Sequence, residues 1–203
     1  MHQITEPMNL QSIIREAGKR SKYLILSPDT ECQHIVSEKT GRTTALFSFF
    51  LPWCFLITLA AGLGAYLFES RLVFSFGYLV FFMISVFFKW VISVFGSAWL
   101  MTEWLPQWNL RKQPGKVFVM YTYSLTPAFF TESVAALFPD LELIRMLGFY
   151  SIYVMLKGSE VLFPDSPVAL HNRITTLAFG LFFLLFIVLQ MVLHHVVRAM
   201  FLS

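Results

Sequence analysis

The sequence predicts an all-α polytopic membrane protein: a bundle of five transmembrane helices preceded by a cytoplasmic amphipathic helix. Of the 203 residues, 57% are hydrophobic and only 13% are charged, whereas soluble domains are about 45–50% apolar and about 25% charged. Apolar runs of about 20 residues, the length that crosses a bilayer, also recur along the chain. The net charge of +3 is small and dispersed, so the sequence predicts no nucleic-acid partner.

Residues 1–43 are predicted to form a cytoplasmic N-terminal segment, without the apolar core of a secretory signal. Residues 9–26 predict an amphipathic helix. A basic helix of this kind beside a span is typical of one lying flat in the interface; a partner-binding helix is the alternative. Pro28 then ends this helix and starts a short second helix over residues 29–38. The apolar face of the first helix consists of Leu10, Ile13, Ile14, Ala17, Ser21 and Leu24, and the other face carries Arg15, Glu16, Lys19, Arg20 and Lys22.

Residues 44–203 are predicted to form a single membrane domain. The second apolar run is too long to cross upright, so we expect it to tilt or to end along the interface. Only a few residues separate the first run from the second and the third from the fourth, and such short loops predict antiparallel hairpins. The five predicted spans cover residues 44–68, 72–101, 117–138, 141–163 and 174–200.

The basic residues predict how this bundle is oriented. Eleven are assigned to the N-terminal side of the membrane and three to the other, while Lys89 lies deep within a span and is left out of the comparison. By the positive-inside rule, the N-terminus is cytoplasmic and the C-terminus lies outside. The eleven are Arg15, Lys19, Arg20, Lys22, Lys39, Arg42, Arg111, Lys112, Lys116, Lys157 and Arg173; the three are Arg71, Arg145 and Arg198.

Two ionisable residues inside predicted spans are candidates for function. A charged group at membrane depth costs roughly 2.5–3.5 kcal/mol on insertion scales, so each is a functional hypothesis. Lys89 either belongs to a functional site within the membrane or extends its ammonium to the cytoplasmic interface. Glu132 follows Pro127 by five residues, and a proline bend beside a carboxylate is typical of an ion or proton site. Its position near the outer end of the third span favours the alternative, a packing bend whose carboxylate reaches the interface.

Other polar residues point to structure rather than chemistry. Lys157 and Glu160 lie three residues apart, which predicts an ion pair on one helix face near the cytoplasmic interface. Cys32 and Cys54 suit neither a disulfide framework nor a zinc site. No nucleophile elbow, HExxH motif or phosphate loop is present. The sequence therefore predicts a protein that is not an enzyme and that carries no cofactor or metal.

Residues 116–163, the central hairpin, carry a family resemblance. The signature residues of the hairpin are, in chain order, Tyr121, Tyr123, Ser124 and Pro127, followed by Gly148, Tyr150, Tyr153 and Gly158. Motifs in this order resemble the YIP domain family (Ypt/Rab-interacting proteins), and most closely its bacterial branch. Leu26–Glu31 is also similar to the segment that precedes the first span in bacterial members. The resemblance implies five spans and a cytoplasmic N-terminus; the Asp-Leu-Tyr-Gly-Pro element of eukaryotic members is absent, which argues against direct GTPase binding.

Two functional hypotheses follow. The first is a non-enzymatic adaptor or accessory subunit of a bacterial inner membrane, which binds lipid and other membrane proteins or itself. Eukaryotic members of the family are adaptors of vesicle traffic, and the resemblance implies this class. The second is a small oligomeric transporter or channel, in which Lys89 and Glu132 face a shared polar cavity. The adaptor hypothesis predicts that Glu132→Gln is tolerated, and the transporter hypothesis predicts that it abolishes a flux.

Overall fold

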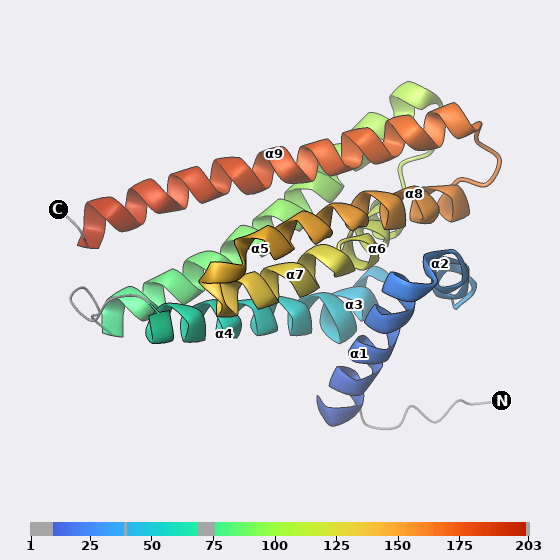
Figure 1. The fold of residues 1–203 in the computed structure, drawn as a ribbon. Helices are drawn as coiled ribbons and strands as arrows, with labels where there is room; N and C mark the ends of the chain where they lie inside the picture. Colours follow the sequence, from blue (N-terminus) through green and yellow to red (C-terminus); the bar gives the residue numbers. More distant parts are fainter. Residues whose placement is uncertain (1–9, 39, 69–75, 202–203) are drawn as a thin grey trace.

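The computed structural model describes residues 10–38, 40–68 and 76–201, and every regular element within these ranges is a helix (Figure 1). This confirms the all-α prediction. Helices α1 (Leu10–Leu26) and α2 (Pro28–Ser37) form a pair at one end of the molecule. The remaining helices form long rods, and successive rods run in opposite directions (Figure 1). The C-terminal end of α9 lies at the end of the bundle away from the α1–α2 pair (Figure 1).

Three of the rods are long and apolar enough to cross a membrane: Arg42–Phe68, Phe76–Trp108 and Val168–Leu193. The first contains α3 (Arg42–Ala45), a π-helical turn (Leu46–Phe50) and α4 (Leu51–Phe68). Pro52 has no N–H to donate to the carbonyl of Ser48, which accounts for the widened turn at this point. The second and third rods are α5 (Phe76–Trp104), extended by the 3₁₀ turn Leu105–Trp108, and α9 (Val168–Phe201). Residues 69–75, where the second span was predicted to begin, lie outside the described ranges.

The third and fourth predicted spans are not continuous helices. The path of residues 117–138 divides into α6 (Pro114–Ser124) and α7 (Thr126–Leu137). Pro127 cannot donate a backbone hydrogen bond to the Tyr123 carbonyl. The hydroxyl of Thr126 donates to that carbonyl instead, at 2.6 Å. The helix therefore bends where the sequence placed the proline.

The path of residues 141–163 begins as a 3₁₀ helix, Pro139–Phe149, and continues as α8 (Tyr150–Leu162). We call Pro139–Phe149 the 3₁₀ segment. Leu141 within it has non-helical backbone angles, φ −95° and ψ 33°. Because a 3₁₀ helix rises faster per residue than an α-helix, this path covers distance with few residues. The segment packs along α7, which brings its charged residues beside those of α7.

An aromatic core holds the rods together, while apolar side chains cover their outer faces. Trp90 of α5 meets Phe129 of α7 at 5.1 Å and Phe186 of α9 at 5.0 Å between ring centroids. Outward-facing apolar residues continue along α9, where Phe183, Leu184, Val188 and Met191 are exposed. Such a surface is expected to face lipid rather than water.

The α1–α2 pair is packed against this bundle. Ala17, Ser21 and Leu24, three members of the predicted apolar face of α1, are buried. The indole of Trp53 in α4 donates a hydrogen bond to the Ser21 hydroxyl at 3.1 Å. The side chains of Leu10, Ile13 and Ile14 lie outside the described residues. Along Ala17–Leu24 the apolar face of α1 therefore contacts protein.

Candidate functional site

A polar cavity of about 390 Å³ lies among α4, α5, α7, α9 and the 3₁₀ segment, and we call it the Lys89 cavity. Lys89 projects from α5, and only 6% of the residue is exposed. Its ammonium donates to the Gln190 side-chain oxygen at 2.8 Å and lies 4.3 Å from the ring centroid of Phe186. Among the described residues, no carboxylate oxygen lies within 4.0 Å of that ammonium. The hydrogen-bond and ring partners of this buried cation are thus neutral, and Lys89 lines the cavity and is not exposed at the surface.

Glu132 lines the same cavity from α7. Its carboxylate accepts a hydrogen bond from Arg145 Nε at 3.0 Å. Arg145 also bonds to Glu142 within the 3₁₀ segment, at 3.3 Å. The two carboxylates therefore balance Arg145, which leaves Lys89 as the cation in the cavity without an anionic partner within ion-pair distance among the described residues.

Sequence reasoning singled out Lys89 and Glu132 but not their partners. Arg145 was counted only as an outer basic residue, although its position inside a predicted span was a usable signal. Gln190 carries no charge and was passed over, although it is the only polar side chain in the apolar run of residues 177–193 of the sequence, which was a usable signal. The structure brings all four side chains to one cavity.

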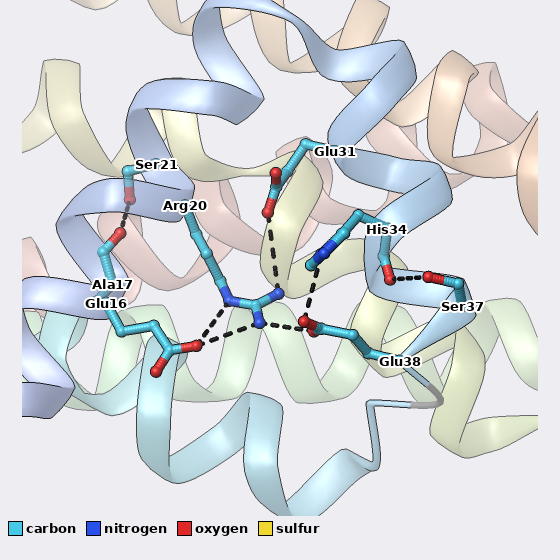
Figure 2. Close-up of polar contacts among 8 residues, drawn as sticks. All are labelled: Glu16, Ala17, Arg20, Ser21, Glu31, His34, Ser37 and Glu38. Atoms are coloured by element: carbon cyan, nitrogen blue, oxygen red, sulfur yellow. Dashed lines mark hydrogen bonds and ion pairs between the residues drawn. The ribbon is translucent and has the colours of Figure 1, made fainter.

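A second polar cluster joins α1 to α2, and sequence reasoning missed it (Figure 2). Arg20 of α1 donates to Glu38 at 2.6 Å and to Glu16 at 3.2 Å, and lies 3.8 Å from Glu31. His34 Nδ1 lies 3.3 Å from the same Glu38. Burial opposes the charge of Arg20, but the hydrogen bonds to Glu38 and Glu16 contribute to raising its pKa above the ordinary value. The usable signal was the Glu16–Arg20 spacing of four, which places the pair on one helix face.

The predicted pair of Lys157 and Glu160 forms, at 3.1 Å, and it includes a third residue. Asp29 of α2 lies 3.1 Å from the Lys157 ammonium. The hydroxyl of Tyr150 donates to the backbone carbonyl of Ile25 at 3.2 Å. Both contacts attach the α1–α2 pair to the central hairpin, so these residues act in structure.

The other signature residues of the hairpin lie mainly in packing positions. Tyr121 donates to the Ala178 carbonyl at 2.7 Å, and the ring of Tyr123 lies 4.5 Å from that of Phe49. A Cβ added at Gly148 would lie 3.0 Å from the Thr131 hydroxyl. Ser124 and Pro127 are buried and Gly158 adjoins Met120 and Ser124. Tyr153 differs, because it is exposed, with its ring 5.5 Å from that of Tyr150.

Within the described ranges, no group of three or more His, Cys, Asp or Glu side chains could hold a metal ion. Cys32 and Cys54 are both buried free thiols. The side chain of His194 lies outside the described residues, and His195 Nδ1 lies 2.9 Å from the Met191 carbonyl.

No protein-family model, curated protein or solved structure matches this chain. The YIP resemblance thus rests on the order of the motifs in the sequence alone.

Proposed function

We propose that this protein is a non-enzymatic membrane adaptor of the YIP family, with five passes through a bacterial inner membrane and a cytoplasmic N-terminus. The alternating directions of the rods in Figure 1 support five passes, with the kinked α6–α7 rod and the path of the 3₁₀ segment and α8 as the third and fourth. The C-terminal end of α9 then lies outside.

The observation that carries the adaptor role is the way in which α1 and α2 are fixed to the bundle. Buried Leu24, Cys32 and Ile35, together with the Lys157–Asp29 ion pair, hold the pair in place. The opposite side of α1 keeps Arg15, Lys19 and Lys22 exposed. A rigid helix pair that presents cations suits an acidic cytoplasmic segment of another membrane protein.

The test is native mass spectrometry of the protein extracted mildly from its host. We expect a stoichiometric complex with a second membrane protein, which dissociates as salt concentration rises. Reversing the charges of Arg15, Lys19 and Lys22 to Glu should abolish it. The matched control, Arg173→Glu, reverses an exposed charge on α9 and should leave the complex intact. A bare monomer, or a complex that survives the triple reversal, would contradict the proposal.

The Lys89 cavity favours one alternative, a small oligomeric transporter or channel. Its support is that Lys89 and Glu132 line one polar space between the rods. In liposomes, a solute or ion flux that Glu132→Gln abolishes and Glu160→Gln preserves would favour the alternative. If neither variant changes permeability relative to empty liposomes, the transporter hypothesis fails.

A further inference from the structure

An apolar groove adjoins the Lys89 cavity, and the two share Glu132, Arg145 and Phe186. We call it the aromatic groove. It runs between the 3₁₀ segment and α9, along Met146, Phe149, Phe179 and Phe183. Met146 is 62% exposed, Phe149 45% and Phe183 43%, so the groove opens on the side of the bundle. The Lys89 cavity, which four charged side chains line, thus adjoins an apolar groove that is exposed on the outer surface of the bundle.

The length and direction of the groove match one lipid leaflet. Gln190, at the cavity, and Phe179, in the groove, are separated by eleven residues of α9. At 1.5 Å per residue this spacing is about 16 Å, close to half of a hydrocarbon core about 30 Å thick. The Lys89 cavity lies toward the C-terminal end of α9, at Gln190, and the aromatic groove runs from there along α9 to Phe179. This is the arrangement of a headgroup and an acyl chain.

Two buried hydrogen-bond donors in this region, Lys89 and Trp90, have more protons to donate than acceptors among the described residues. The Lys89 ammonium has three protons; it donates one to the Gln190 side-chain oxygen and lies over the ring of Phe186. Trp90 lines the aromatic groove and is only 2% exposed. Its indole Nε1 finds no hydrogen-bond acceptor among the described residues. A buried donor without an acceptor is costly, and a ligand that supplies one removes that cost.

We propose that a phospholipid from the outer leaflet occupies this composite site. Its phosphate binds the Lys89 ammonium, its ester region accepts a hydrogen bond from Trp90, and one acyl chain lies in the aromatic groove. The inference rests on the placement of the bundle in a bilayer and not on the adaptor role. It also gives the cavity a resident lipid in place of the solute that a transporter would carry.

The test is titration of delipidated protein in detergent with phosphatidylglycerol, followed by native mass spectrometry. We expect one tightly held lipid per chain. Lys89→Gln should weaken its binding roughly tenfold to a hundredfold, because a hydrogen bond to a charged group contributes about 1.5–3 kcal/mol. Trp90→Phe keeps most of the volume and should weaken binding about fivefold, as a neutral hydrogen bond contributes about 1 kcal/mol. The control Lys157→Gln removes a lysine that pairs with carboxylates elsewhere and should change nothing.

Two further probes separate the parts of the ligand. Diacylglycerol has the chains without the phosphate and should fail to bind at comparable concentration. Inorganic phosphate has the anion without the chains and should fail to displace the lipid. If diacylglycerol binds as well as phosphatidylglycerol, or if Lys89→Gln and Trp90→Phe both retain full affinity, the proposal is wrong. Displacement by inorganic phosphate would equally overturn the lipid and leave only an anion site. Neither result depends on whether a protein partner docks on α1.

Discussion

In the α1–α2 pair, Arg20 lies among the carboxylates of Glu16, Glu31 and Glu38, whereas in the Lys89 cavity a lysine has only an amide oxygen and an aromatic ring as partners. Both cations are largely removed from solvent. A cation surrounded by carboxylates joins the helices that supply them. A buried cation that no carboxylate contacts has less to offset the cost of its burial, although Glu132 lines the same cavity as Lys89, so such a cation is a candidate for binding a ligand.

The largest effect is expected from replacing Arg20, which tests whether this cation joins α1 to α2. Replacing it with Ala leaves the three carboxylates repelling one another across the joint between α1 and α2. A lost hydrogen bond to a charged group costs about 1.5–3 kcal/mol, so local opening of the pair should become roughly tenfold to a hundredfold more frequent. The readout is the labelling rate of Cys32, resolved by peptide mass spectrometry. Arg15→Ala is the control, because Arg15 is exposed on the same helix. Equal labelling rates in the two variants would refute a structural role for Arg20.

Cys32 suits this purpose because it is a buried residue of α2 on the face that lies against Met120 and Gly158 of the hairpin. Burial, assisted by the charges of Asp29 and Glu31, raises the pKa of its thiol to about 12, from an ordinary value of 9.0. The docked thiol therefore stays protonated and unreactive at neutral pH. A pKa raised in the folded state contributes stability below pH 9 that is lost as pH rises toward 12. Labelling of the wild type should accordingly accelerate above pH 9 by more than thiolate formation in an exposed cysteine predicts.

The second prediction is that replacing Lys89 does not lower the stability of the protein, in contrast to replacing Arg20. Lys89→Met removes a buried charge that has no ion-pair partner within 4.0 Å among the described residues, and it keeps a similar volume. Burial opposes a charge that lacks an ion-pair partner, so we expect the free energy of unfolding in lipid-free detergent to stay the same or to rise. Denaturation followed by circular dichroism measures this. A large loss of stability would show that Lys89 is structural, and the contrast with Arg20 would then be wrong.

The difference between the two regions also explains how much the sequence could predict. Lys89 and Glu132 were recognisable because a charge within an apolar run is conspicuous. The Arg20 cluster was not, since each of its members is an ordinary residue on a polar helix face. The cluster exists only because Pro28 turns the chain and places α2 beside α1.

The membrane helices show the same limit. The first, second and fifth rods were predicted from the length of their apolar runs, because a long apolar run is by itself the signal for a helix that can cross a membrane. The third and fourth paths depend on local backbone chemistry. Pro127 predicted a bend but not that it would divide the path into α6 and α7, and nothing in residues 139–149 distinguished a 3₁₀ helix from an α-helix. Because the 3₁₀ segment determines which side chain faces α7, the Arg145–Glu132 contact could not be predicted.

A smaller effect is expected at the hydrogen bond between Trp53 and Ser21. Trp53→Phe keeps the aromatic stacking on Phe129, whose ring centroid lies 6.1 Å away, and removes only the donor. We expect docking of α1 to weaken by about 1 kcal/mol, the usual contribution of a neutral hydrogen bond. Hydrogen exchange of the α1 amides should rise about fivefold. Phe55→Leu, an outward-facing change on the same rod, is the control and should leave α1 exchange unaltered.

The smallest effect should come from the ion pair between Lys157 and Asp29, which joins α2 to α8. Asp29 is more than half exposed and Lys157 also pairs with Glu160, so solvent and a second carboxylate both reduce what one contact contributes. A double-mutant cycle of Asp29→Asn and Lys157→Gln should give a coupling energy of about 0.5 kcal/mol, which falls as salt is added. A coupling several times larger, or one insensitive to salt, would mean that this pair and not the Arg20 cluster determines whether the helices stay docked.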